Sequence, residues 1–224
     1  YDWLHAGHRD GPDETLWHLY SAARGIVGNS DRRPMVSRDY KSAMDQFGYR
    51  AYPKGAWVLH MLRTQLGTDL YRRCVRTYLE RHALGTVVTE DLNSIVEELS
   101  GRSFDRFFDQ YVYHARHPEL SVSYAWDEQY DLAKITAKQT HEVDEDVLLF
   151  QVATKVRFDF EDGLSVERDL LVTEAAEDFY FPLDAQPQVV RFDPDLGVLA
   201  KVSFDKPTAM LYAQLEDAGD VVGR

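Results

Sequence analysis

Cysteine is nearly absent from this sequence: Cys74 is the single one among 224 residues. An internal disulfide is therefore impossible, an extracellular disulfide scaffold is excluded, and the isolated thiol favours a reducing compartment such as the cytoplasm. No apolar run approaches the roughly 20 residues needed to span a bilayer. No cationic segment followed by an apolar one marks a leader peptide. We therefore expect no membrane-spanning segment.

Positive charge is also scarce. Lys and Arg number 25 against 38 Asp and Glu, which gives a net charge of -13 at pH 7. This surplus of negative charge repels phosphate groups, so nucleic acid and anionic membrane are disfavoured as partners. The sequence contains no glycine-rich phosphate loop and no Gly-x-Ser-x-Gly elbow for a nucleophilic serine. These absences disfavour nucleotide binding and serine-based catalysis.

The helical zinc-binding motif His-Glu-x-x-His is missing as well. The single His-Glu pair, His141-Glu142, lacks the second histidine and falls in an expected loop. A zinc hydrolase needs three protein ligands and an open position for water. Two His-x-x-His pairs have no acidic or cysteine ligand in a suitable frame: His5/His8 and His114/His117. We expect no metal site in this chain, with both pairs at solvated helix ends.

The remaining composition is that of a globular chain, with 44% hydrophobic and 12% aromatic residues. Its length suits one large domain or two ordinary ones. In the first half, apolar residues recur at the spacing of amphipathic helices. Gly11-Pro12 begins one helix and Gly28-Asn29 ends it, and an irregular polar stretch follows to Gly48. Further helices are predicted over 53–66, 68–80, 89–100 and 103–111.

From Leu120 the apolar period changes to two, which is typical of half-buried strands. Strands are predicted over 120–126 and 150–160, and Asp162-Gly163 turns the chain into a further strand over 164–172. Shorter strands are expected around 179–181, 190–192 and 198–204. Strands at this spacing indicate a β-sandwich. After Asp205-Lys206-Pro207 the helical pattern returns.

The predicted fold class is therefore α+β with two segregated parts. An all-helical subdomain is followed by an antiparallel β-sandwich and a short C-terminal helix. The change of period places the boundary near His117-Pro118. We accordingly predict three regions: a helical region over 1–117, a β-sandwich domain over 118–205, and the start of another helical region over 206–224.

One polar side chain stands at the start of the most apolar helix. Tyr52 directly precedes Pro53 in the run Tyr49-Arg50-Ala51-Tyr52-Pro53-Lys54-Gly55-Ala56-Trp57. The free amides and the dipole of a helix start favour nearby negative charge, and a phenol there can donate a hydrogen bond to a developing oxyanion. A tyrosine in this position is also commonly a core or boundary residue. The residues alone leave both roles of Tyr52 open.

Two stretches follow each other at this helix start: Tyr52-Pro53-Lys54-Gly55-Ala56 and Val58-Leu59-His60-Met61-Leu62. Together they resemble the tyrosine-bearing helix start of the zinc aminopeptidases of the aminopeptidase N family. Similar stretches continue along the chain: Leu66-Gly67, Tyr78-Leu79-Glu80-Arg81-His82, Thr89-Glu90-Asp91-Leu92, Ser100-Gly101-Arg102, Phe107-Phe108-Asp109-Gln110-Tyr111 and His117-Pro118-Glu119-Leu120. The resemblance extends over residues 1–205. The tail from Asp205 to Arg224 resembles the opening of a helical-repeat region such as HEAT repeats.

The resemblance implies that this chain is the rear portion of a larger zinc aminopeptidase, which removes N-terminal residues from peptide substrates. It assigns residues 1–117 to the C-terminal part of the catalytic domain and makes Tyr52 the catalytic residue that assists the metal. The zinc ligands are expected upstream of Tyr1. We therefore expect no cofactor in this chain, and no activity of the chain alone.

Some relatives in this family have lost the zinc chemistry and act as scaffolds. The alternative function is therefore a non-catalytic module that binds other proteins through its helices and sandwich. A His-Glu-x-x-His motif with a downstream glutamate before Tyr1 favours the enzyme, and its loss favours the scaffold. The sequence predicts neither the substrate side-chain preference nor the oligomeric state.

Overall fold

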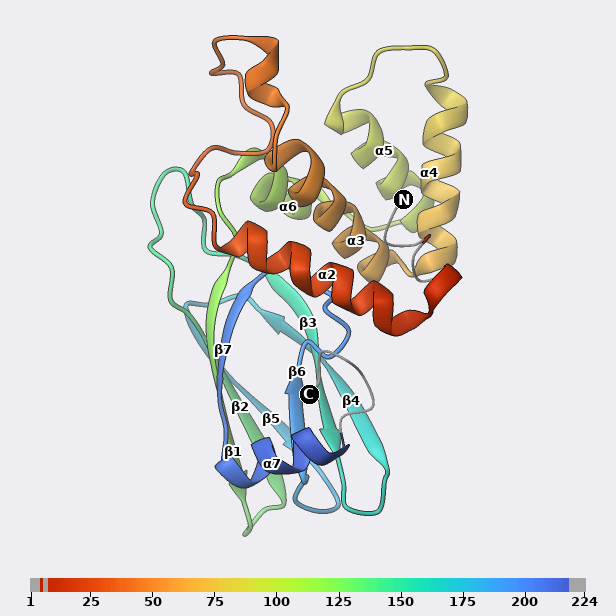
Figure 1. Ribbon diagram of the computed structural model, residues 1–224. Coiled ribbons are helices and arrows are strands. Elements are labelled where there is room, and N and C mark those ends of the chain that lie inside the picture. Colours follow the sequence, from red (N-terminus) through yellow and green to blue (C-terminus); the bar gives the residue numbers. More distant parts are fainter. Residues whose placement is uncertain (1–4, 6–7, 218–224) are drawn as a thin grey trace. The chain divides into compact units, whose positions relative to one another are not determined.

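The structure is a computed structural model that describes residue 5 and residues 8–217 (Figure 1). Its described residues form two compact units. The helical unit consists of Asp31–Arg116 and Asp144–Leu148. The sandwich unit consists of the described residues up to Ser30, His117–Val143, and Leu149 onward.

The helical unit contains the helices predicted from the 3.6-residue period. Its elements are a 3-10 turn at Ala43–Gln46, a π-helical turn at Arg50–Lys54, α3 at Gly55–Leu66, α4 at Thr68–Arg81, α5 at Thr89–Ser100, α6 at Asp105–Phe108, and a second π-helical turn at Asp109–Tyr113. Helix α4 packs against both α3 and α5 (Figure 1). The core consists of buried side chains from each helix, among them Trp57, Met61, Cys74, Val96 and Phe108.

The sandwich unit contains seven described strands in two sheets. The strands are β1 (Glu119–Asp127), β2 (Leu132–Gln139), β3 (Val152–Asp159), β4 (Ser165–Val172), β5 (Ala176–Pro182), β6 (Val189–Phe192) and β7 (Lys201–Asp205). One sheet has the order β5-β2-β1-β7 and the other β4-β3-β6. The strands β1 and β7 are parallel, and the other paired strands are antiparallel.

Alternate side chains of the strands fill the space between the two sheets, as the period of two predicts. Val122, Ile135 and Val156 are fully buried members of three different strands. The Phe158 ring on β3 lies 5.6 Å, between centroids, from the Phe181 ring on β5. Because β3 and β5 belong to different sheets, this contact joins the two layers of the sandwich.

The predicted α+β fold class is confirmed, with two corrections in the sheets. Strand β2 was not predicted, because two of its three inward positions are alanines, Ala133 and Ala137, which have low strand propensity. The sandwich is also not wholly antiparallel. Strand β7 lies parallel to β1, with Val202 opposite Leu120. A period of two is the same in both orientations, so the sequence pattern does not distinguish them.

Two helices flank the strands in the sequence. Helix α2 (Pro12–Val27) begins with Pro12 in its first turn and buries Leu19 and Ile26, and it groups with the sandwich unit. Helix α7 (Thr208–Asp217) packs against β6. Residues 218–224, which belong to the predicted helical-repeat region, lie outside the described residues. No helix in the described part of the chain is long and apolar enough to cross a membrane.

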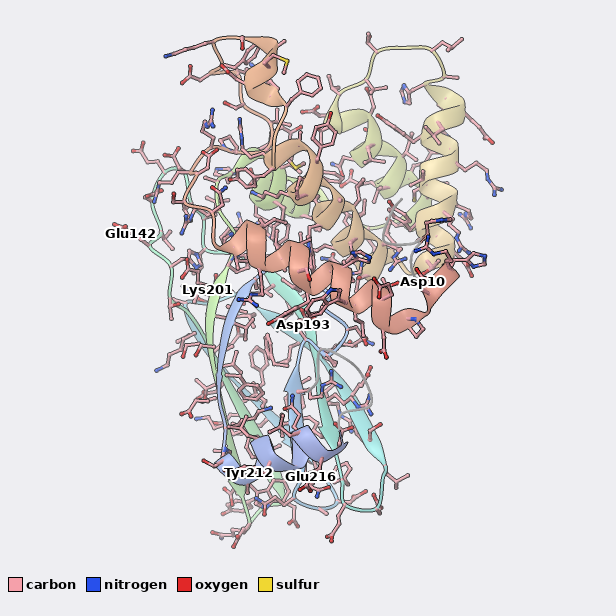
Figure 2. The ribbon with its side chains drawn as sticks, in the orientation of Figure 1. Asp10, Glu142, Asp193, Lys201, Tyr212 and Glu216 are labelled. Carbon is pink, nitrogen blue, oxygen red and sulfur yellow. The ribbon has the colours of Figure 1, made fainter. Side chains whose placement is uncertain are left out.

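A buried carboxylate fixes the turn between β6 and β7. Asp193, labelled in Figure 2, follows β6 directly and has a positive φ of 52°. Its carboxylate accepts hydrogen bonds from the Gly197 amide (2.8 Å), the Val198 amide (3.1 Å) and the Thr154 hydroxyl (3.0 Å). Burial raises the pKa of Asp193 to about 6, although these hydrogen bonds favour the charged form. The contacts indicate a structural role.

Candidate active site

Tyr52 lies in the middle of the π-helical turn Arg50–Lys54. The helix predicted to begin at Pro53 is therefore preceded by a wider turn. Pro53 has no N–H group and cannot donate a helical hydrogen bond. The Lys54 amide instead donates to the Tyr49 carbonyl at 2.9 Å, five residues back, and the Tyr52 amide donates to the Gly48 carbonyl at 3.1 Å. Single π-helical turns occur frequently at functional sites.

A cavity of about 1040 Å³ opens beside this turn, and every residue of its lining belongs to the helical unit. The lining is mainly apolar and comes from the stretch before the first π-helical turn, from both π-helical turns, from α3 to α6, and from the loop that leads into α5. Its residues include Met35, Val36, Tyr52, Leu59, Val88, Leu92 and Val112. Large apolar clefts with a few polar groups are typical of ligand-binding sites. This cavity is therefore the candidate site of the helical unit.

The Tyr52 side chain is open to solvent, with 61% of its surface exposed, and it contributes to the wall of the cavity. Its ring packs against the Phe47 ring, 6.3 Å away between centroids. None of the described residues makes a hydrogen bond to its hydroxyl group. Buried tyrosines usually satisfy their hydroxyl within the protein, whereas this hydroxyl is available to a bound molecule.

Two polar side chains form a pair at the wall of the same cavity. The Tyr113 hydroxyl donates a hydrogen bond of 2.7 Å to the Glu90 carboxylate. This hydrogen bond is the main cause that lowers the pKa of Glu90, and the nearby charge of Arg38 lowers it further. Burial is the main cause that raises the pKa of Tyr113. The pair therefore presents a carboxylate in its charged form beside the apolar lining.

Two buried cations flank Tyr52 and were not singled out from the sequence. Arg50 is 5% exposed and Lys54 is 3% exposed. The Lys54 ammonium donates a hydrogen bond of 3.0 Å to the Arg116 carbonyl. Burial lowers the pKa of Lys54 to about 8, and the neighbouring charge of Arg50 adds to this effect. Both residues stand within the quoted motif, but their burial depends on partners outside it, and that of Lys54 is 62 residues away in the sequence.

The described residues do not offer a zinc site. No group of three or more His, Cys, Asp or Glu side chains within residue 5 and residues 8–217 is arranged to hold a metal ion. His141, part of the single His-Glu pair, instead accepts a hydrogen bond from the Glu119 amide at 3.3 Å. Its ring also packs edge-on against Phe150. His114 contacts the Asp109 carboxylate at 3.1 Å. These residues therefore do not supply the set of ligands that a zinc ion needs.

Comparison with known proteins shows what the segment that carries this site is similar to. Residues 20–111 match the Peptidase family M1 domain. The chain is 30% identical over 117 residues to Aminopeptidase M1-C of Oryza sativa subsp. japonica, a stretch that covers 50% of this chain and 13% of that protein. It is 31% identical over 71 residues to Aminopeptidase N of Lactococcus lactis subsp. lactis, which covers 32% of this chain and 8% of that protein.

A solved structure supports the fold over nearly the whole chain. Legionella pneumophila aminopeptidase A, in complex with aspartic acid, superposes with a TM-score of 0.80 at 16% sequence identity. The match covers 99% of this chain and 25% of that one. The chain is thus similar to the aminopeptidases of peptidase family M1 in sequence, and to a solved aminopeptidase in fold, and the resemblance inferred from the sequence is confirmed. It spans a small part of the length of these relatives.

Proposed function

We propose that the protein to which this chain belongs, called the parent protein below, is a zinc-dependent aminopeptidase that hydrolyses N-terminal residues from peptides. In this proposal Tyr52 is a catalytic residue, residues 1–117 form the end of the catalytic domain, and α7 opens a helical-repeat region. The described residues do not form a zinc site, so zinc would be held by other residues of the parent protein and would supply the activation of water. The chain itself supplies the hydroxyl of Tyr52 and the cavity beside it.

The observation that carries the proposal is the environment of the Tyr52 hydroxyl. The side chain lines a cavity of about 1040 Å³, is 61% exposed, and has no hydrogen-bond partner for its hydroxyl among the described residues. It also lies within the segment that matches the Peptidase family M1 domain. A tyrosine of the core usually has its hydroxyl hydrogen-bonded within the protein.

The chemistry that Tyr52 can supply is hydrogen-bond donation. Attack on a peptide carbonyl places negative charge on its oxygen, and a donor that is already in position stabilises that charge without reorganising. A phenol is suited to this task because its O–H group is a hydrogen-bond donor. The apolar lining of the cavity offers contacts to side chains of the peptide.

Tyr52→Phe in the parent protein tests this role. The variant loses one oxyanion donor while it keeps the ring, so we expect turnover of an aminoacyl-anilide to fall about 100-fold or more, with little change in melting temperature. Tyr40→Phe is the matched control. Tyr40 is 54% exposed and does not belong to the cavity lining, so this variant should keep full turnover.

Intact turnover in Tyr52→Phe together with a lower melting temperature would show that Tyr52 is a packing residue. A parent protein that hydrolyses no peptide and binds no zinc would instead favour the non-catalytic scaffold. In that case the cavity would be a surface for protein contacts rather than a substrate site.

A further inference from the structure

The π-helical turn that carries Tyr52 has an unusual distribution of burial. Tyr52, at its centre, is exposed, whereas the cationic side chains at its two ends are buried: Arg50 is 5% and Lys54 3% exposed. Lys and Arg are almost never fully buried unless they are paired. The burial of two cations within five residues therefore calls for partners that hold them.

Arg50 is held by the stretch that precedes the turn. Its guanidinium donates hydrogen bonds to the Pro34 carbonyl (2.8 Å) and the Asp45 carbonyl (3.1 Å). Its Nε atom also lies 3.6 Å from the Asp31 carboxylate. The rigid fork of a guanidinium suits several acceptors at fixed positions. Arg50 thus fixes the start of the turn to both ends of the stretch 31–45.

Lys54 is held from a different side. Its ammonium donates to the carbonyl of Arg116, a residue with a positive φ of 71° that follows the second π-helical turn. The segment around this second turn is itself joined to the stretch before the first, because the Val36 amide donates to the Val112 carbonyl at 3.0 Å. The two cations therefore anchor the Tyr52 turn to two separate stretches of backbone.

Tyr52 depends on these anchors for its position. Its ring has a single aromatic neighbour, Phe47, and its hydroxyl has no bond to hold it among the described residues. Pro53, next to it, lacks an N–H group, so the turn has one backbone hydrogen bond fewer than a regular helix. The orientation of the phenol is therefore set by the backbone on either side of it.

We propose that Lys54, together with Arg50, is a positioning residue that holds the Tyr52 hydroxyl at the cavity through main-chain carbonyls on either side of the π-helical turn. This inference rests on the proposed catalytic role of Tyr52. A displacement of about 1 Å at a reacting group lowers rates by as much as about 100-fold. Loss of the Lys54 anchor therefore acts on turnover more than on substrate binding.

Lys54→Met is the direct test, because methionine has a similar length and no donor. Lys206→Met is its matched control. Lys206 is a half-buried lysine whose pKa is also lowered to about 8, and its ammonium donates to a main-chain carbonyl, that of Val190, at 2.9 Å. It belongs to the sandwich unit and does not line the cavity.

In the parent protein we expect Lys54→Met to lower kcat by about tenfold or more with KM nearly unchanged, and Lys206→Met to change neither. In the present chain, amide hydrogen exchange at Tyr52 and Lys54 should accelerate by about tenfold in Lys54→Met but not in Lys206→Met. The 19F signal of 3-fluorotyrosine at position 52, assigned with Tyr52→Phe, should shift or broaden in the same variant.

If Lys54→Met keeps kcat, exchange and the fluorine signal while Tyr52→Phe loses turnover, the positioning role is wrong and the catalytic role stands. If Tyr52→Phe keeps turnover, the proposed function is wrong, and exchange and the fluorine signal alone decide whether Lys54 orders the turn. Should Lys54→Met fail to fold, Arg50→Lys serves instead. It keeps the charge but cannot reach both carbonyls, so unchanged exchange at Tyr52 would overturn the proposal.

Discussion

Two tyrosines of the helical unit illustrate how environment decides what a phenol can do. Tyr111 is 2% exposed and packs against the Phe107 ring, 5.3 Å away between centroids, so it belongs to the core. Tyr52 is exposed at a cavity and has no partner for its hydroxyl among the described residues. Both tyrosines stand at the centre of a π-helical turn, and the difference lies in what each turn buries: Arg50–Lys54 buries its two end residues, whereas Asp109–Tyr113 buries Gln110, Tyr111 and Val112.

Lys54 makes the stability of the chain depend on pH in the alkaline range. Its pKa is about 8 in the folded chain and returns to about 10.4 on unfolding. Between these values the unfolded chain binds a proton that the folded chain has released, so the free energy of unfolding rises with pH. Below pH 8 Lys54 is charged in both states, and the contribution is absent because the folded chain then buries a charged ammonium. Above about pH 10.4 Lys54 is neutral in both states, and the gain in the free energy of unfolding reaches about 3 kcal/mol.

Urea unfolding of the wild type and of Lys54→Met at several pH values from about 7 to about 10 measures this effect. The stability of the wild type relative to the variant should increase across this range. Lys206 titrates in both proteins, so its contribution cancels in the difference. A difference that stays constant with pH would show that the Lys54 ammonium keeps an ordinary pKa.

At the scale of secondary structure, the elements with strong local signals are those that the sequence predicted. Helix α2 begins at a proline, and α5 ends at Gly101 with a left-handed φ of 67°. Strand β3 alternates buried with exposed or half-buried positions over its whole length, and its strongest signal is the run Val156-Arg157-Phe158-Asp159, where apolar and polar residues alternate. These signals act over a few residues, so no knowledge of the tertiary structure was needed.

The elements that the sequence did not predict depend on distant partners. Strand β2 is identified by its pairing with β1 and β5, because its alanines resemble neither a strand nor a core. The same holds for the candidate site. Tyr52 was found through its motif, whereas the burial of Lys54 depends on the Arg116 carbonyl, 62 residues further along the chain.

The small inward residues of β2 give a prediction about packing. Ala137 is fully buried between the sheets, and Ala137→Leu adds three carbon atoms where there is no room. We expect this variant to lower the free energy of unfolding by about 1–3 kcal/mol. Ala125→Leu is the matched control, because Ala125 is exposed on the neighbouring strand β1 and should change stability by at most about 0.5 kcal/mol.

Urea unfolding of the three proteins decides this prediction. Equal stability of Ala137→Leu and Ala125→Leu would mean that the space around β2 is looser than the buried surface indicates. A selective loss in Ala137→Leu would confirm that small side chains at these positions allow the two sheets to approach.

At the scale of the whole molecule, the chain carries one proposed catalytic residue and no described metal ligand group. Tyrosine cannot replace the activation of water by a metal. We therefore expect the purified chain to contain less than stoichiometric zinc and to hydrolyse an aminoacyl-anilide no faster than a buffer blank. Elemental analysis of the dialysed chain measures the zinc content and an aminoacyl-anilide assay measures the turnover, with a known zinc aminopeptidase as the positive control for both.

One tightly bound zinc ion per chain, or turnover above the blank, would contradict this expectation. Either result would require ligands that the described residues do not bring together. It would also show that zinc binding or activity does not need the greater length of chain that the M1 relatives have. The variant Tyr52→Phe would then show whether the measured turnover uses the proposed site.

The parallel pair of β1 and β7 has a consequence for how the protein is made. Glu119 on β1 meets Lys201 on β7 across 82 residues of sequence, with an ion pair of 3.1 Å. A ribosome that adds about 5–20 residues per second needs roughly 4–16 seconds for this distance. During that interval the outer edge of β1 has no neighbouring strand, and an open strand edge can pair with the same edge of another nascent chain. Completion of the sandwich therefore depends on synthesis reaching its last strand.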